Sequence, residues 1–397
     1  MLVSIALLLL SVPVLLWTMY LAFLAVLSGE NPVPHYQAVA QTRFDIIVPA
    51  HDEETGIAAT VQSLLGVDYP KELFRVIVVA DNCSDATAVR AADAGARVIA
   101  REDAARRGKG YALAFGFERT LAEGTADAVV VVDADTRVTP NLLRAFEARR
   151  RSGAAVAQAE YAVANRKASW RTRLMHIAFT LFHDVRSRAR ERLGLSTGLR
   201  GNGMLFATSL LREFPHDAFS IVEDVEYGIR LGLSGYRVHY VGEAQVFGEM
   251  VAAEGPSRSQ RRRWEGGRAL LARRHALPLA IAGLRRRSAM ILDLAVDLLV
   301  PPLTYVALAL SSGLVGSAIW VGFGHGPLWS LAPWCVSAVC FASYVLRGAW
   351  LARVGASALL DLAWAPFYMV WKLALALRAR ASSQREWVRT EREARKP

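Results

Sequence analysis

Cysteine is scarce in this sequence. The 397 residues include three, Cys83, Cys335 and Cys340, and no two of them form a Cys-x-x-Cys pair. A disulfide-stapled secreted module and a cysteine-based zinc site are therefore excluded, because both need paired cysteines. The three thiols fit a reducing compartment or burial in a membrane, and we assign them no chemistry.

Support for nucleophilic catalysis is also missing. The sequence has no His-Glu-x-x-His motif and no cysteine beside a motif histidine. The eight histidines are scattered, and His176 and His183 share one helical face, which favours packing over catalysis. Nucleic-acid binding is disfavoured, because the arginines gather beside apolar segments and no nucleic-acid-binding module is recognisable.

Charge is absent from residues 2–27. A helix of this length spans about 39 Å, more than the roughly 30 Å of a bilayer core. A cleaved signal peptide is the alternative, but the run has no basic start, no Ala-x-Ala site and too many apolar residues. We therefore predict an uncleaved transmembrane helix in residues 1–28.

A second apolar region follows Arg287 and divides into three segments, 303–321, 328–346 and 356–377. The third contains Asp361, Pro366 and Lys372, which are unfavourable in a membrane-spanning helix. Before these segments, residues 291–300 contain Asp293 and Asp297 and end at a proline pair. Carboxylates are costly at the bilayer centre, so we predict that residues 291–300 form a helix lying in the membrane interface.

These segments predict four parts. Residues 1–28 form a transmembrane helix, 29–287 a soluble domain, 288–378 the interface helix and C-terminal transmembrane helices, and 379–397 a basic tail. The net charge of +11 is concentrated in arginine-rich parts, which predicts an integral protein of the inner or plasma membrane with its soluble domain cytoplasmic and its N-terminus outside. Two later crossings return the tail to the cytoplasm, so we expect the third segment to lie in the interface or to re-enter.

The soluble part alternates short apolar runs with helical stretches. The runs 44–48, 76–79 and 128–132 are rich in β-branched residues and do not alternate with polar ones, as is typical of parallel strands buried on both faces. Helical stretches are expected at 55–65, 85–94 and 109–122. The pattern predicts an α/β fold with a βαβαβ core, in which ligands bind beyond the carboxyl ends of the strands.

Carboxylates follow two of these predicted strands. Asp81 ends the second, and Asp133-Ala134-Asp135 follows the third. Two carboxylates two residues apart can share Mg²⁺ or Mn²⁺, which prefer oxygen ligands and complete their shell with substrate phosphates. A surface turn is the alternative for so common a pattern, and the residues after Asp81 also fit a helix cap.

Two further motifs are weak when taken singly. Lys109 lies in Gly-Lys-Gly, which suggests contact with a phosphate but is not a P-loop, and a solvated loop is the alternative. Glu223 and Asp224 stand at the start of a helix expected to run to Leu233. A carboxylate there interacts with the helix dipole or, if it points into a cleft, serves as a general base.

The sharpest signal is the run from Gln260 to Arg263 and Trp264. Ten arginines and one acidic residue, Glu265, occur between positions 258 and 287. We expect part of this stretch to lie on anionic lipid. A tryptophan beside arginine and glutamine also offers a stacking face for a sugar, a bidentate donor for a pyrophosphate and an amide for hydroxyl groups.

In this order the motifs resemble those of membrane-embedded family 2 glycosyltransferases with a GT-A catalytic domain, such as cellulose, chitin-oligosaccharide and hyaluronan synthases and ceramide glucosyltransferase. The resemblance covers positions 44–264 and extends to the flanking membrane segments. It implies a Rossmann-like mixed sheet flanked by helices, inserted between transmembrane helices. It also implies a divalent cofactor, Mg²⁺ or Mn²⁺.

The resemblance assigns a role to each motif. A nucleotide sugar is expected to bind at Pro49, Ala50, Glu53, Asp81, Lys109, Asp133 and Arg263. The metal is expected at Asp135 and Asp133. The acceptor is expected at Gly201, Asn202, Gly203, Gln260 and Trp264. Asp224 corresponds to the catalytic base, with Glu223 beside it.

The implied reaction is the inverting transfer of a hexose or N-acetylhexosamine, UDP-linked, to a growing polysaccharide at the membrane. The sequence departs from the synthases at Val222, where cellulose synthases carry threonine, at Asn82-Cys83, where many members have Asp-Gly, and in its small membrane portion. Transfer of one sugar to a lipid acceptor therefore stays open. A catalytically inactive membrane scaffold is disfavoured, because every acidic motif residue is present.

Overall fold

The three β-branched runs form neighbouring strands near one end of a mixed sheet. The computed structural model describes residues 2–166, 169–249 and 254–355. Within them the strand order is β3-β2-β1-β4-β7-β6-β8-β5. The strands are β1 (Phe44–Ala50), β2 (Phe74–Asp81), β3 (Arg97–Arg101), β4 (Ala128–Val131), β5 (Thr136–Val138), β6 (Val156–Val163), β7 (Met204–Ala207) and β8 (Val238–Gly248).

Strand direction changes halfway across this sheet. β3, β2, β1 and β4 are parallel, whereas β7 pairs antiparallel with both β4 and β6. β6 and β8 are again parallel, and β5 pairs antiparallel with β8. The predicted mixed α/β sheet is confirmed, and the βαβαβ pattern read from the apolar runs describes only its first four strands.

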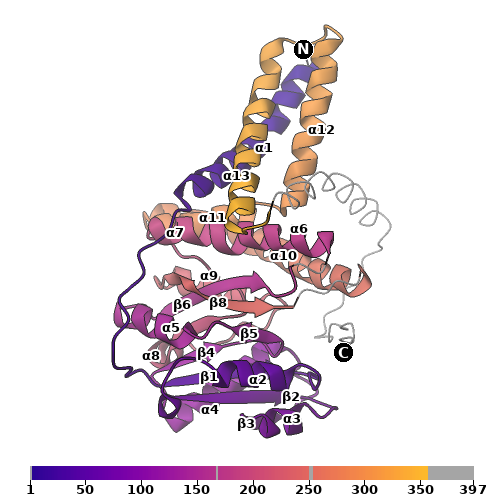
Figure 1. Cartoon of the computed structure of the whole chain (residues 1–397). Helices are drawn as coiled ribbons and strands as arrows, with labels where there is room; N and C mark the ends of the chain where they lie inside the picture. Colours follow the sequence, from indigo (N-terminus) through magenta and orange to yellow (C-terminus); the bar gives the residue numbers. More distant parts are fainter. Residues whose placement is uncertain (1, 167–168, 250–253, 356–397) are drawn as a thin grey trace.

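Helices connect the strands and cover the sheet (Figure 1). Two predicted helices begin two residues later than expected. Asp85 lies just ahead of the second of them, where its side chain accepts hydrogen bonds from the Glu54 and Thr87 amides. The helices of this part are α2 (Ile57–Leu65), η1 (Lys71–Leu73), α3 (Thr87–Asp93), α4 (Lys109–Glu123), α5 (Leu142–Arg151), α6 (Trp170–Phe179), η2 (Thr180–Val185, one π-helical turn), α7 (Arg186–Arg192), α8 (Thr208–Glu213), α9 (Glu223–Leu233) and α10 (Glu254–Arg285).

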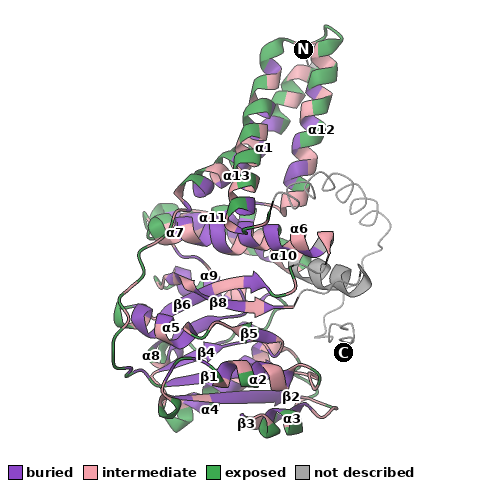
Figure 2. Ribbon diagram, in the orientation of Figure 1, coloured by how far each residue is buried: buried purple, intermediate pink, exposed green. Residues whose placement is uncertain are grey.

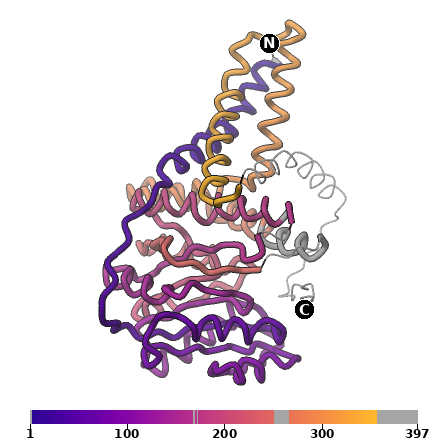
Figure 3. The backbone as a smooth tube through the Cα atoms, in the orientation of Figure 1, coloured from indigo at the N-terminus to yellow at the C-terminus, as the bar shows by residue number. Residues whose placement is uncertain are grey.

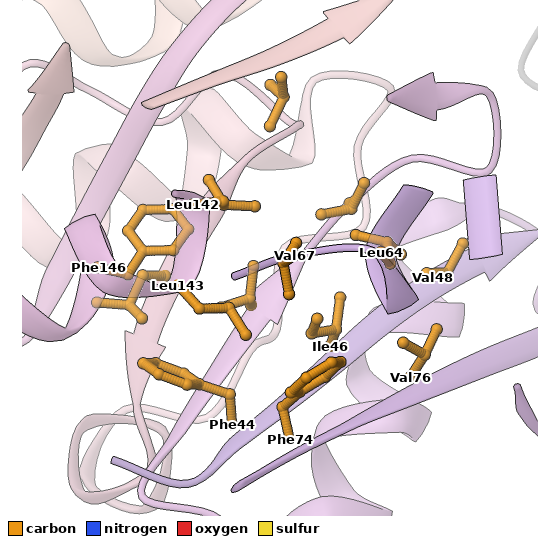
Figure 4. Close-up of a cluster of buried hydrophobic side chains, with 14 of the residues drawn as sticks. Phe44, Ile46, Val48, Leu64, Val67, Phe74, Val76, Leu142, Leu143 and Phe146 are labelled. Atoms are coloured by element: carbon orange, nitrogen blue, oxygen red, sulfur yellow. The ribbon is translucent and has the colours of Figure 1, made fainter. Parts of the chain in front are cut away.

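Both faces of the parallel strands are packed, which explains why their sequences do not alternate. On one face Phe44, Ile46 and Val48 of β1 pack with Leu64 of α2 and Phe146 of α5 (Figure 4). On the other face a second apolar cluster joins the sheet to α4 through residues that include Ile47, Leu113 and Phe117. This double core fixes the strand ends where the motif carboxylates stand.

Three helices are long and apolar enough to cross a membrane: Val3–Leu27, Leu303–Gly322 and Leu328–Leu351. They correspond to α1 (Leu2–Leu27), α12 (Leu303–Gly322) and η3 (Leu328–Leu331) with α13 (Ala332–Leu351). They rise together from one end of the α/β part, and their outer faces are largely exposed (Figures 1 and 2). From α1 the chain runs down the side of the domain to β1 (Figure 3). The predicted segment 356–377 and the tail 379–397 lie outside the described residues.

The predicted interface helix is α11 (Ala289–Leu299), between α10 and α12. Its two carboxylates point into the protein instead of toward interfacial water, since Asp293 and Asp297 are buried. They form ion pairs within a group of four arginines, which we name the arginine cluster: Arg186 and Arg190 of α7, Arg200, and Arg268 of α10. Burial of both aspartates is thus explained by arginines that lie far away in the chain.

The arginine cluster also joins the α/β domain to two of the candidate membrane spans. Arg190 donates a hydrogen bond to Tyr20 of α1 at 2.7 Å, and Arg186 donates one to Tyr344 of α13 at 3.0 Å. Nearby, His183 packs against the rings of Tyr161 and Phe179, as predicted for a packing histidine. Burial lowers the pKa of His183 below its ordinary value.

Candidate active site

The ends of three neighbouring strands carry the first motif residues. β2 ends at Asp81, β1 ends with Pro49 and Ala50, and Asp133 lies two residues beyond β4. β1 lies between the other two strands, and Ala50 stands opposite Ala80 in the register. The strand order therefore brings the expected nucleotide and metal residues to one edge of the sheet, as the sequence predicts.

Lys109 lies where the other motifs converge. Its Nζ is 2.5 Å from Oδ1 of Asp133 and 3.8 Å from Oε1 of Glu223, and it donates a hydrogen bond of 2.6 Å to the carbonyl oxygen of Gly201. These partners come from the β4 end, the start of α9 and the Gly201–Gly203 loop. One ammonium group thus connects four segments that lie between positions 109 and 223 of the sequence.

The electrostatics of this group follow from burial and mutual contact. Burial disfavours the ammonium of Lys109, but the adjacent carboxylates of Asp133 and Glu223 outweigh it and raise the pKa of Lys109. Burial and the neighbouring Asp224 raise the pKa of Glu223 despite Lys109. Burial also raises the pKa of Asp224. The site therefore holds a permanent cation beside carboxyl groups that accept protons more readily than usual.

Glycine is required on both sides of Asn202. Gly201 has φ +78° and Gly203 has φ +69°, the left-handed region that side chains disfavour. A Cβ at Gly201 would lie 3.4 Å from Oδ2 of Asp224, and one at Gly203 would lie 2.8 Å from Cγ2 of Val246. The predicted acceptor loop therefore lies directly against the predicted base.

Asn202 and Gln158 fix this loop to the strand end. Asn202 is fully buried; its Oδ1 accepts a hydrogen bond from the Asp133 amide at 3.1 Å, and its Nδ2 donates to Thr136 at 2.8 Å. Gln158 donates to the Asn202 carbonyl at 2.7 Å and accepts from the Arg200 amide at 2.8 Å. A role for Gln158 was not predicted from the sequence. The one signal of such a role there is a single amide side chain in an apolar stretch.

Replacing Gln158 by methionine is expected to destabilise the protein. The change leaves the Arg200 amide and the Asn202 carbonyl buried without a partner, at about 1–3 kcal/mol each. Chemical unfolding of the full chain in detergent measures the loss. Gln62→Met, at an exposed position of α2, is the matched control. Equal unfolding midpoints for the two variants would show that Gln158 does not hold the loop.

Asp81, the expected contact of the nucleotide base, already has a partner. Its side chain is fully buried, and Oδ1 lies 2.5 Å from the Arg101 guanidinium at the end of β3. Its Oδ2 has no hydrogen-bond partner among the described residues. Arg101 also lies over the ring of Tyr111, 5.8 Å from its centre. Arg101 and Tyr111 are therefore neighbours of the expected base site that the motifs did not reveal.

The predicted metal residues have suitable donor chemistry. Asp133 and Asp135 are both half-buried and offer carboxylate oxygens from one tight segment, the ligand type that Mg²⁺ and Mn²⁺ prefer. The Lys109 ammonium, 2.5 Å from Asp133, shows that this position favours a cation. The residues present therefore fit a divalent ion.

A second cluster of possible ligand atoms lies in the neighbouring loops. Asp52, Cys83 and Asp85 each have a ligand atom within 4.8 Å of the others. The Ser84 amide donates to Asp52, and the Glu54 and Thr87 amides donate to Asp85. These carboxylates therefore brace the loop after β2. Glu53, in the loop after β1, is half-buried, and its amide donates a hydrogen bond to the Thr87 hydroxyl at 2.7 Å.

The remaining predicted residues, Gln260, Arg263 and Trp264, belong to α10 by their backbone, and their side chains lie outside the described part of the structure. One turn beyond Trp264, a Cβ at Gly267 would lie 2.9 Å from Cγ1 of Val222. Val222 immediately precedes Glu223. This part of α10 therefore packs beside the start of the Glu-Asp helix.

A Gly-x-Ser-x-Gly string, a pattern typical of serine hydrolases, occurs at positions 194–198. Ser196 is 1% exposed, and its hydroxyl accepts a hydrogen bond from the Val238 amide at 3.1 Å. The serine is thus a buried structural residue that joins the loop to β8, and it provides no exposed nucleophile.

The chain is similar to known glycosyltransferases. The chain is 25% identical over 276 residues to the probable glycosyltransferase YdaM of Bacillus subtilis, covering 64% of each. It is 31% identical over 251 residues to the beta-monoglucosyldiacylglycerol synthase of a Synechocystis species, covering 61% of this chain and 50% of that protein. The chain thus spans between half and two thirds of the length of these curated relatives.

Among solved structures, the mannosyltransferase PcManGT from Pyrobaculum calidifontis, in complex with GDP-Man and Mn²⁺, is similar with a TM-score of 0.52 at 17% identity. That likeness covers 87% of this chain and 96% of the other, and it shows the shared fold. Residues 41–267 match the family described as Glycosyltransferase like family 2. Because this match covers more than half of the chain, the protein belongs to family 2 of the glycosyltransferases and has the GT-A fold.

Proposed function

We propose that the protein is an inverting, metal-dependent glycosyltransferase that transfers a sugar from a UDP-linked donor to an acceptor hydroxyl at the membrane. The observation that carries this proposal is the convergence at Lys109 of Asp133, Glu223 and the Gly201 loop, with Asp224 against that loop. Donor residues and a candidate base are thereby within reach of one small ligand.

Each of these residues has a proposed role in the reaction. Asp133 and Asp135 would hold a divalent ion, which when bound neutralises charge on the departing diphosphate. Lys109 is placed to donate hydrogen bonds to the same phosphates. Asp224, whose pKa is raised by burial, accepts the proton of the attacking hydroxyl. Attack on the face opposite the leaving UDP inverts the anomeric centre.

Gln260, Arg263 and Trp264 complete the proposed site. The packing of Gly267 against Val222 supports their placement, because Trp264 lies one helical turn away, near the start of α9. We assign Arg263 to the donor diphosphate, and Gln260 and Trp264 to the acceptor sugar or headgroup.

The proposal is tested by UDP release from a panel of UDP-sugars. Membranes that contain the full chain are incubated with each donor in Mg²⁺, in Mn²⁺ and in EDTA. We expect one donor to be consumed in a metal-dependent manner, with inversion at C1. Absence of metal-dependent turnover with every donor would contradict the proposed activity, and consumption of a GDP-sugar alone would correct the nucleotide.

For the acceptor we favour a lipid over a growing polysaccharide. A polymer channel needs helices that enclose a polar passage. In the described structure, by contrast, each of the three candidate spans has between 22% and 28% of its most apolar stretch buried. The relative from Synechocystis is named for a glucosyl lipid product. Labelled donor and membranes distinguish the two: one organic-soluble product supports the lipid, and an insoluble ladder supports the polymer that the Gln-x-x-Arg-Trp motif suggests.

We further propose that the N-terminus lies outside and the catalytic domain in the cytoplasm. With α1, α12 and α13 as crossings, the loop between α12 and α13 is then external. In a variant lacking the three native cysteines, we expect an impermeant maleimide to label His325→Cys in intact cells. Glu118→Cys, exposed on α4, should be labelled only after permeabilisation. The reverse pattern would invert the topology.

A further inference from the structure

The arginine cluster contains more positive than negative charge. Its four guanidinium groups share two carboxylates, those of Asp293 and Asp297. Arg186, Arg190 and Arg268 each lie within 3.0 Å of one of these carboxylates. Arg200 forms no ion pair with any carboxylate of the described residues, although Asp297 is near enough to attract its charge.

Arg200 is buried although it forms no direct ion pair among the described residues. It is 8% exposed, one guanidinium nitrogen donates to the Thr197 carbonyl at 2.9 Å, and Nε has no hydrogen-bond partner in the described structure. Its guanidinium stacks on Phe182 of η2, 4.3 Å from the ring centre. Burial lowers the pKa of Arg200 to about 9; Asp297 opposes this shift, and Arg190, Arg268 and Arg186 add to it.

A purely structural role explains only part of this arrangement. Stacking on Phe182 and the bond to Thr197 help to hold Arg200, but an arginine has five donors, and burial of a guanidinium without a direct ion pair is costly. A leucine or methionine would fill the same space without that cost. The unmatched donors indicate that a negative partner joins the cluster during function.

The position of Arg200 shows what kind of partner could reach it. The next residue, Gly201, lies against Asp224, and the Arg200 amide is fixed by Gln158. On the other side, the cluster contacts Tyr20 of α1 and Tyr344 of α13. Arg200 therefore lies between the candidate base and the membrane helices, on the side of the site from which a membrane acceptor would arrive.

We propose that Arg200, together with Arg268, binds a phosphate group carried by the acceptor. A phosphate matches the paired donors of a guanidinium and would supply the charge that the cluster lacks. The inference rests on the proposed transferase function and specifies its acceptor as a phosphate-bearing molecule with a free hydroxyl. That phosphate belongs either to a lipid headgroup or to a small soluble ester, which share the same chemistry.

The experiment compares acceptors that differ in phosphate and in source. The full chain in phosphatidylcholine nanodiscs, with its UDP-sugar donor and metal, receives phosphatidylglycerol, diacylglycerol or free glycerol 3-phosphate. We expect a kcat/KM at least tenfold higher for a phosphate-bearing acceptor than for diacylglycerol. Preference for phosphatidylglycerol identifies a lipid source, and preference for glycerol 3-phosphate identifies a soluble one.

Variants of Arg200 separate binding from folding. Arg200→Met is expected to raise KM for the phosphate-bearing acceptor at least tenfold, while KM for the donor stays unchanged. Arg200→Lys should restore part of the loss because it keeps the charge. Arg212→Met, at an exposed position of α8, is the control and should behave as the wild type. An equal loss with diacylglycerol and with the phosphate-bearing acceptors would reduce Arg200 to a structural residue and overturn the proposal.

A binding measurement keeps this inference separate from the transferase proposal. With UDP and Mg²⁺ saturating the donor site, inorganic phosphate is expected to raise the thermal midpoint of the wild type but not of Arg200→Met. A shift without any sugar transfer would support the phosphate site while refuting the proposed activity. Transfer to neutral acceptors without a phosphate-dependent shift would overturn the phosphate site alone.

Discussion

Replacing Asp224 by asparagine is expected to lower the rate of sugar transfer by roughly 1,000-fold, because removal of a positioned general base costs about 10²–10⁴ in rate. Asparagine keeps the size of the side chain and cannot accept the proton of the attacking hydroxyl. Donor binding should be retained, since Lys109 and the two proposed metal ligands, Asp133 and Asp135, are unchanged. Steady-state transfer and equilibrium binding of UDP measure the two effects separately.

The pH profile gives a second measure of the Asp224 variant. Burial raises the pKa of Asp224 above its ordinary value, so activity of the wild type should fall on the acid side at a higher pH than for an ordinary aspartate. Glu226→Gln, in the first turn of the same helix, is the matched control. If Asp224→Asn transfers sugar at the rate of Glu226→Gln, the base is another group.

Replacing Lys109 by methionine is expected to impair both stability and donor use. The ammonium lies near Asp133, Glu223 and Asp224, and without it these carboxyl groups repel one another. Loss of one partner from a buried ion pair costs about 3–5 kcal/mol, and we expect the lower value because Asp133 is 29% exposed. Loss of a charged hydrogen bond to the donor phosphates should lower kcat/KM by at least about tenfold.

The two effects of the Lys109 change can be separated. Lys71→Met removes the same charge from an exposed position in η1 and should alter neither property. Unfolding in denaturant measures the loss of stability. Donor titration at a temperature where both variants are folded measures the change in kcat/KM for the donor. Unchanged donor KM in Lys109→Met would place Lys109 in a structural role and remove it from the phosphate site.

Local sequence signals predicted the parts of this fold that depend on neighbouring residues. The run of β-branched residues at 128–132 predicted the strand β4, and the carboxylates that follow it marked the strand end at which Asp133 meets Lys109. The start of α9 at Glu223 and its end at Leu233 agree with the prediction, because acidic residues favour a first helical turn. The exchange from parallel to antiparallel pairing at β7 has no such local signal, since it depends on long-range topology.

Residues whose role depends on distant partners were not predictable in the same way. Gln158 acts through two backbone groups more than 40 residues away, and Arg101 acts through Asp81. Asp293 and Asp297 were expected to face the interface, because nothing near them in the chain offers the arginines that they meet. A single sequence contains no record of such contacts, whereas the motif carboxylates could be recognised from their places at strand ends.

The arginine cluster also has a consequence for biogenesis. Arg186 is separated from Asp297 by 111 residues, and Tyr20 from Arg190 by 170. During translation the arginines leave the ribosome well before α11 does, so the nascent domain cannot bury them without an uncompensated charge. The side of the domain that contains these arginines should therefore remain loose until α11 has emerged, and the enzyme should acquire its final form only near the end of synthesis.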